Sequence, residues 1–148
     1  MYSSSVKPSR VVLAVLLTLP LWFASKPAIS QKLPEFKIER PTIIAFYSPN
    51  KLAKEDAPDE NEVRADFQLY TGQAKPPLQK MGVALLDTAA RTFRIRNGDQ
   101  TTTFRASSNV GYYFIAPGKE PRIEYEVMTD VDLVQAAREY FQLKFKEP

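Results

Sequence analysis

An unbroken run of apolar and aromatic residues, Ile43–Tyr47, leads directly into the turn signal Ser-Pro-Asn at 48–50. A strand with one face in water alternates apolar and polar residues, whereas a run without alternation indicates burial on both faces. We therefore predict that Ile43–Tyr47 is the central strand of a sheet, with a loop at its carboxyl end, where sites tend to form. Two similar runs, Val83–Leu86 and Tyr112–Ile115, predict two further buried strands.

Two segments have the 3.6-residue period of amphipathic helices. In the first, Asp59 with Glu62 resembles a capping box, Pro76 and Pro77 predict an interruption or a kink, and Gly82 predicts the end. The second begins at Thr129, with Asp132 three residues later. The apolar stripes are Val63, Phe67 and Tyr70 in the first helix, and Leu133, Val134, Ala137, Tyr140 and Phe141 in the second.

Weaker alternation predicts two more strands. Phe36 and Ile38 indicate a lead-in or edge strand, and Arg122–Val127 alternates with Ile123, Tyr125 and Val127 on its buried face. Between strand-like segments, Asn97-Gly98 is typical of the two-residue type I′ turn of a hairpin. That turn sets Phe93 opposite Thr102, Ile95 opposite Gln100 and Asp99 opposite Arg96, with Thr92, Arg94, Arg96, Thr101 and Thr103 on the other face.

The order strand, helix, strand, hairpin, strand, turn, strand, helix over residues 41–145 resembles the thioredoxin-like fold. Residues 45–49 look like its first core strand and the approach to its active-site loop, and residues 111–145 look like its closing hairpin and terminal helix, with Pro117-Gly118-Lys119 as the tight turn. The resemblance implies an α/β fold with a thioredoxin-like mixed β-sheet flanked by helices and an inserted β-hairpin.

Two motifs of that family are missing. The loop in the position of Cys-x-x-Cys contains Ser48, Pro49, Asn50 and Lys51, and the position of the cis-proline is occupied by residues 109–111, Asn-Val-Gly. The resemblance therefore implies a redox-inactive member of the superfamily.

The first 30 residues have the pattern of a secretory signal peptide. Lys7 and Arg10 precede the 14-residue apolar run 11–24, and small residues at Ala28 and Ser30 favour cleavage after Ser30. The alternative is an uncleaved amino-terminal anchor. We expect a secreted or periplasmic protein, with residues 31–148 as a single domain that has no membrane segment once the signal is cleaved.

The amino-acid composition limits the partners and the reactions that the protein can have. The chain contains 20 Lys and Arg against 17 Asp and Glu, and three of the bases with none of the acids lie in residues 1–30. Residues 31–148 therefore carry no net charge, so we expect no nucleic-acid partner. The chain has no Cys and no His. Thiol, Ser-His-Asp and imidazole-ligated metal chemistry are thereby excluded, and no cofactor is expected.

The candidate binding residues are arginines with neighbouring threonine hydroxyls on the predicted hairpin. Guanidinium groups suit carboxylates and phosphates, whereas the alternative is a solvated face whose charges discourage edge pairing. Other patterns have ordinary explanations: acids at 55–62 favour a helix start, and the tyrosines at 112, 113, 125 and 140 fit a core. The binding candidates are Arg91, Arg94, Arg96, Thr101 and Thr103, with Arg105 in the same group.

These features favour an exported, non-catalytic binding module whose partner is a protein or a small anionic ligand. The alternative is a small hydrolase that uses carboxylates or Lys at the loop after the central strand, where Ser48 and Lys51 have the Ser-x-x-Lys spacing of serine acylases. A purely structural subunit is a third possibility, for which a large apolar surface patch would be the sign.

Overall fold

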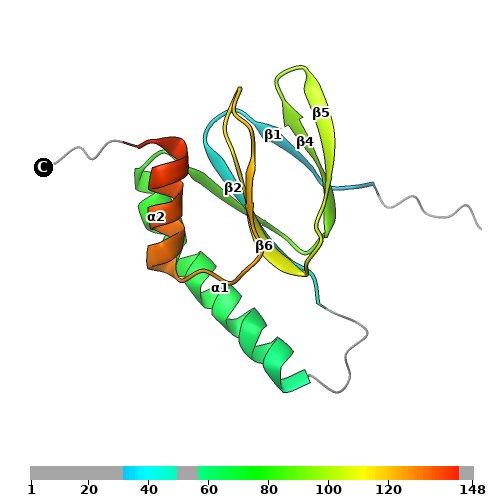
Figure 1. Cartoon of the computed structure of the whole chain (residues 1–148), viewed down its shortest axis with the longest axis vertical. Helices are drawn as coiled ribbons and strands as arrows, with labels where there is room; N and C mark the ends of the chain where they lie inside the picture. Colours follow the sequence, from blue (N-terminus) through cyan, green and yellow to red (C-terminus); the bar gives the residue numbers. More distant parts are fainter. Residues whose placement is uncertain (1–31, 50–56, 144–148) are drawn as a thin grey trace, which may run out of the picture. The chain divides into compact units, whose positions relative to one another are not determined.

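The computed structural model describes residues 32–49 and 57–143, so the predicted signal peptide lies outside the described residues. The described part is an α/β protein with two mixed sheets and two helices (Figure 1). One sheet has the order β1-β4-β5 and the other β3-β2-β6-β7. The elements are β1 (Glu35–Ile38), β2 (Thr42–Tyr47), α1 (Ala57–Lys80), β3 (Ala84–Thr88), β4 (Thr92–Asn97), β5 (Gln100–Arg105), β6 (Val110–Ile115), β7 (Arg122–Glu124) and α2 (Asp130–Phe141).

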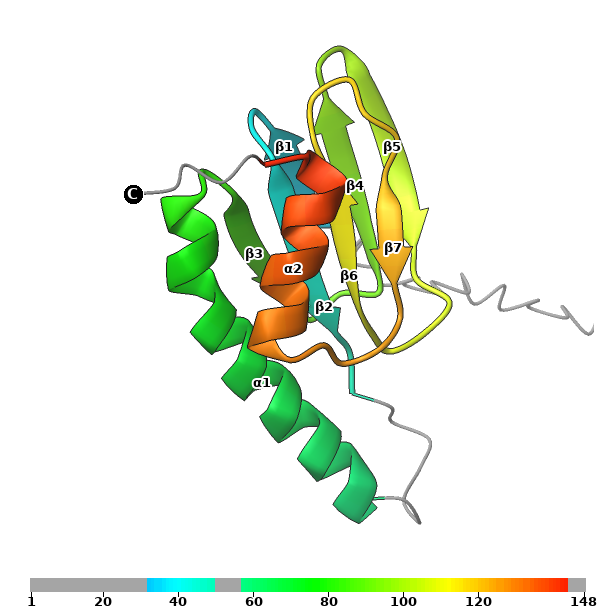
Figure 2. The ribbon, with the colours of Figure 1, turned by 60° about the vertical axis from the view of Figure 1, so that its left-hand side comes forward.

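The prediction of a central strand is confirmed by β2. It pairs in parallel with β3 and antiparallel with β6, and the side chains from Ile43 to Phe46 are fully buried. Its odd-numbered residues pack against the helices, and its even-numbered residues pack against the three-stranded sheet. Residues 32–143 therefore form three layers, with both helices on one face of the four-stranded sheet and the β1-β4-β5 sheet on the other (Figure 2).

Aromatic rings fill the space between the two sheets. Phe93 is fully buried, with ring centroids 5.5 Å from Phe36, 6.1 Å from Phe46 and 5.0 Å from Phe104. Large, well-contacted rings of this kind contribute strongly to the burial of apolar surface. They fix the β4–β5 hairpin against the four-stranded sheet.

Helix α1 differs from its prediction at its start and at its two prolines. It begins at Ala57, two residues before the expected cap at Asp59, because Pro58 fits the first turn, where its missing N–H is not needed. It also continues through Pro76 and Pro77 to Lys80 as one helix, so of the two predicted alternatives, an interruption or a kink, the interruption was wrong. Both prolines are exposed, so the carbonyls that they leave unbonded can reach water, and the buried Ala74 and Leu78 hold the helix to the sheet. Gly82 has φ of +79° and ends the helical segment as predicted.

Two strand predictions were wrong in part. The side chain of Leu86 is 37% exposed, because β3 is the outer strand of its sheet and the second sheet does not extend over it. Strand β7 ends at Glu124, and the ring of Tyr125 is 38% exposed rather than buried, because the chain leaves the sheet there toward α2. Val83, Leu85 and Tyr112–Ile115 are buried as predicted.

The hairpin forms, but its predicted register was wrong. Asn97 pairs with Gln100, so Gly98 and Asp99 are the two turn residues, Phe93 lies opposite Phe104, and Thr101 rather than Asp99 lies opposite Arg96. Gly98 has positive φ and Asp99 does not, which is the pattern of a type II′ turn. The shift moves the partner strand by two residues, so each side chain keeps the face that was predicted for it.

Helix α2 begins as predicted. The Thr129 Oγ1 accepts a hydrogen bond from the Asp132 backbone N–H at 3.2 Å. Leu133, Ala136 and Ala137 are buried, and Tyr140 and Phe141 are partly buried against the same core.

Candidate binding surface

The outer face of the β1-β4-β5 sheet carries four exposed basic side chains. Pairing places Arg94 between Glu35 and Thr103, and Arg96 between Lys37 and Thr101. Alternation along β5 adds Arg105 to the same face, beside Thr103. We call this surface the basic face; it consists of Lys37, Arg94, Arg96, Thr101, Thr103 and Arg105.

Within the described part of the chain, three of the four basic side chains on the basic face have no ion-pair partner, and one acidic residue, the exposed Glu35, lies opposite Arg94 on the same face. Lys37 Nζ lies 2.6 Å from a carboxylate oxygen of Glu39, in an exposed ion pair. Among the described residues, the guanidinium groups of Arg94, Arg96 and Arg105 make no hydrogen bond and no ion pair. Because the observed register puts Thr101 opposite Arg96, Asp99 does not neutralise that arginine.

The backbone beneath the basic face is held from the other side. Phe93 and Ile95 alternate with Arg94 and Arg96 along β4, and both are essentially fully buried between the sheets. At the hairpin tip, the side-chain amide of Asn97 donates to the Ala116 carbonyl at 3.3 Å. The two central arginines therefore project from a strand whose position is fixed, and only their side chains are free to adapt.

Arg91 does not join the basic face. It precedes β4, and its Nη2 donates to the Ala106 carbonyl at 3.4 Å, while the Ala106 N–H donates to the Arg91 carbonyl at 2.7 Å. These bonds close the open end of the hairpin. The structure thus brings together Arg94, Arg96, Thr101 and Thr103 and gives Arg91 a structural contact instead.

Lys37 is the member of the basic face that sequence reasoning missed. The alternation in residues 35–38 is too weak to show which strand lies beside them. Their partner is β4, which pairs with β1 in parallel and lies more than fifty residues later in the chain. No local pattern specifies such a pairing.

The loop after the central strand is described only at its start. The Ser48 N–H donates to the Asn109 carbonyl at 2.7 Å, and the Tyr47 hydroxyl donates to the Glu60 carbonyl at 3.3 Å. Partial burial raises the pKa of Tyr47 above that of an ordinary phenol. Asn50 and Lys51, together with Glu55 and Asp56, lie outside the described residues.

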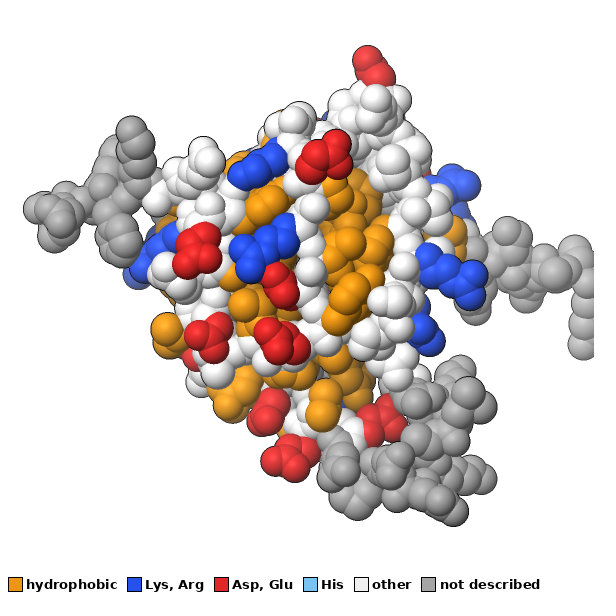
Figure 3. Space-filling model, viewed as in Figure 1, with side chains coloured by type: hydrophobic (Ala, Val, Ile, Leu, Met, Phe, Trp, Pro, Cys, Tyr) orange, Lys and Arg blue, Asp and Glu red, His pale blue; other side chains and the backbone are white. Residues whose placement is uncertain are grey.

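A groove lies between the outer strands β5 and β7, beside the basic face. It has a volume of about 340 Å³, and its lining includes Phe104, Tyr113, Ile115 and Ile123. Figure 3 shows apolar side chains gathered on the side of the molecule where β7 and β5 lie. The rim is polar and includes Thr102 and Lys119.

The described part of the chain has neither a metal-binding cluster nor a membrane-spanning helix. Residues 32–49 and 57–143 contain no cluster of three or more acidic or other metal-ligating side chains placed to hold a metal ion. Within the same ranges, neither helix has the length and hydropathy that a membrane crossing requires.

No protein-family model, curated protein or solved structure matches this chain. What the protein does is therefore inferred from its own residues alone.

Proposed function

We propose that this protein is an exported, non-catalytic binding module that contacts a carboxylate-bearing protein or a small anionic ligand through the basic face. The observation that carries this proposal is the set of three exposed guanidinium groups without partners among the described residues, on a strand pair fixed by a buried aromatic core. Guanidinium groups bind carboxylates through two parallel N–H···O bonds, which gives direction as well as attraction.

The spacing of the arginines favours an extended acidic partner. Arg94 and Arg96 are two residues apart on one strand, and the rise of about 3.3 Å per residue places their Cα atoms roughly 7 Å apart. Acidic residues that alternate along a strand or an extended segment have the same spacing. Thr101 and Thr103, opposite the two arginines, supply hydroxyl groups for additional hydrogen bonds.

The absence of net charge over residues 31–148 makes the attraction local. A domain with 17 bases and 17 acids has no long-range field of one sign, so an anionic partner is recognised by the basic face rather than by the whole molecule. Binding through such a face weakens with added salt, because exposed charges are screened over about 10 Å at 0.1 M ionic strength.

The scaffold that we propose is a redox-inactive variation on the thioredoxin-like fold. The order of β2, α1, β3, β6, β7 and α2 along the chain supports this proposal, as does the mixed sheet in which β2 lies between its parallel neighbour β3 and its antiparallel neighbour β6. In this proposal the β4–β5 hairpin, paired with β1, covers the sheet face opposite the helices.

Export is the remaining part of the proposal. The basic start, the apolar run and the small residues up to Ser30 support cleavage and release into the periplasm or the medium. Amino-terminal sequencing of the exported protein is expected to begin at Gln31.

The test is a pull-down from envelope extract with the exported protein and with an Arg94→Glu, Arg96→Glu variant. A matched control, Arg64→Glu with Lys80→Glu, makes the same charge change at exposed positions on α1, which lies on the opposite side of the molecule. Circular dichroism and urea unfolding should first show that both variants are folded. We expect a partner that the parent and the control capture and the hairpin variant loses. Equal capture by all three proteins, or capture of nothing, would contradict the proposal.

A further inference from the structure

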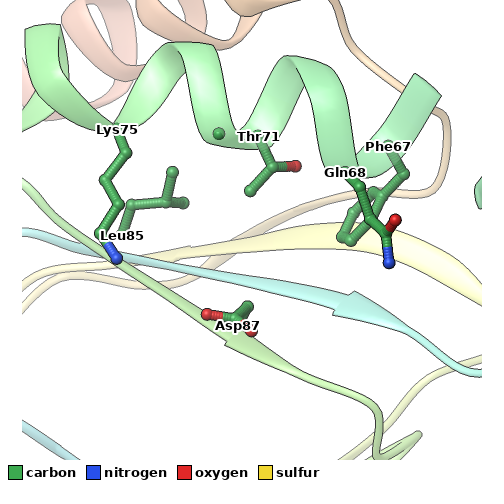
Figure 4. A pocket seen from close by; sticks show the side chains of 7 residues that line it. Phe67, Gln68, Thr71, Lys75, Leu85 and Asp87 are labelled. Carbon is green, nitrogen blue, oxygen red and sulfur yellow. The ribbon is translucent and has the colours of Figure 1, made fainter. Parts of the chain in front are cut away.

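A second site lies on the other side of the four-stranded sheet, between α1 and the outer strand β3. It is a pocket of about 210 Å³ lined by Phe67, Gln68, Thr71, Gly72, Lys75, Leu85 and Asp87 (Figure 4). None of these residues belongs to the basic face.

The floor of the pocket is apolar and fixed. Phe67 and Leu85 are 6% and 5% exposed, and the Phe67 ring lies with its centroid 5.6 Å from Tyr47 and 5.7 Å from Tyr112. Gly72 has open space where a side chain would stand, with no atom within 4 Å of the position that a Cβ would occupy. The helix therefore leaves room above a small hydrophobic surface.

One basic and one acidic side chain lie at the mouth of the pocket. Lys75 extends from α1 toward the sheet, and Asp87 lies on β3 on the same strand face as Leu85, which packs under the helix (Figure 4). Both side chains are exposed, and no ion pair joins them. A cation and an anion held apart across one small opening present complementary ends to a ligand that carries both charges.

Two uncharged polar groups complete the lining. The Gln68 amide projects from the same side of α1 as Lys75 and offers both a donor and an acceptor (Figure 4). The hydroxyl oxygen of Thr71 is buried and has no hydrogen bond of normal geometry. It lies near the Tyr112 phenol, whose pKa is raised by burial, and this proximity offsets part of the rise. Buried polar groups without partners are uncommon and are found where a ligand or water completes them.

We propose that this pocket binds a small zwitterion with an apolar side chain, that is, a free aliphatic amino acid. Lys75 contacts its carboxylate, Asp87 contacts its ammonium group, and the aliphatic side chain covers Phe67 and Leu85. An apolar pocket with a few convergent polar groups is the usual form of a small-molecule site. A peptide interior carries neither charge, and a peptide terminus carries one of them, so the pair selects the free amino acid.

The experiment is a titration of the isotope-labelled full chain with L-leucine, followed by backbone amide chemical shifts. Two analogues each lack one charge: 4-methylpentanoate has no ammonium group, and L-leucinamide has no carboxylate. We expect saturable shifts at residues 67–75 and 85–87 with millimolar L-leucine, and binding about tenfold weaker with either analogue, because a hydrogen bond to a charged group is lost.

Two variants assign the charges. The Lys75→Gln variant should bind L-leucine no more tightly than it binds L-leucinamide. The Asp87→Asn variant should bind L-leucine no more tightly than it binds 4-methylpentanoate. The controls Lys80→Gln and Asp99→Asn remove the same charges at exposed positions outside the pocket and should keep the parent affinity. The absence of saturable shifts at the pocket, or equal affinity for all three compounds in the parent, would overturn the proposal. Because the basic face is not involved, either outcome is independent of the proposed function.

Discussion

Gly111 illustrates how one residue controls the packing between the sheets. It lies opposite Phe46 in the β2–β6 pair, and a Cβ at this position would meet the Phe46 ring at 2.7 Å and would also collide with the Glu124 carbonyl oxygen. Neither neighbour can move freely, because the oxygen belongs to the backbone and Phe46 is fully buried. Only glycine fits this position on β6.

We therefore expect Gly111→Ala to lower the free energy of unfolding by about 1–3 kcal/mol, the usual effect of overpacking. Gly72→Ala is the matched control, because a Cβ there has no atom within 4 Å and lies in a helix, where replacing glycine stabilises by about 0.5–1 kcal/mol. Urea unfolding measures both. A Gly111→Ala variant as stable as the parent would contradict this account of the core.

Tyr113 makes the stability of the folded protein depend on pH in the alkaline range. Burial raises its pKa to about 12, and negative charge on Tyr140 and Glu120 adds to the rise. The unfolded chain loses this proton near the ordinary tyrosine pKa of 10.0, whereas the folded protein retains it. The contribution of Tyr113 to stability is therefore fully present below pH 10 and is lost as the pH rises toward 12.

The measurement compares urea unfolding of the parent and of Tyr113→Phe across that pH range. We expect the stability of the parent relative to the variant to fall as the pH rises, because phenylalanine has no proton to lose. If the two proteins lost stability in parallel, Tyr113 would not be the group responsible.

At the scale of single elements, α2 depends on its first turn. Thr129 Oγ1 accepts from the Asp132 N–H, and the Thr129 hydroxyl also donates to the Asp132 carboxylate at 2.7 Å. Thr129→Ala should lower the free energy of unfolding by about 1 kcal/mol, whereas Thr129→Ser keeps the hydroxyl and should remain within a few tenths of a kcal/mol of the parent. Thermal or urea unfolding distinguishes the two variants, and equal losses from both would show that the cap is not the cause.

The elements also show what local sequence can predict. The strand β2 and the cap of α2 were predictable, because an unbroken apolar run and a Thr-x-x-Asp spacing act within a few residues. The path of α1 through Pro76 and Pro77 was not, because the burial of Ala74 and Leu78 against the sheet outweighs the local preference to break. The hairpin register was missed for a related reason: pairing Phe93 with Phe104 brings the partly buried Phe104 ring to 5.0 Å from the buried Phe93 ring, and that pairing requires Gly98-Asp99 as the turn.

At the scale of the whole molecule, the two candidate sites differ in how many of their residues could be predicted from the sequence. Five of the six residues of the basic face were candidates from the sequence of the hairpin, since a two-residue error in register leaves every face unchanged. The pocket between α1 and β3 was not predicted, because it requires knowing that Lys75 and Asp87, on a helix and an edge strand, open onto the same cavity. Sites that combine distant segments become visible only in three dimensions.

The central claim, that the basic face is the contact surface, is tested most directly by amide hydrogen exchange of the protein alone and bound to its captured envelope partner. The account predicts slower exchange in residues 35–38, 92–97 and 100–105 on binding, reduced by added salt and absent in the Arg94→Glu, Arg96→Glu variant. Protection confined to residues 47–49, or to the groove strand β7 and the turn at 116–121, with these strands unchanged, would contradict it and assign the contact to another surface.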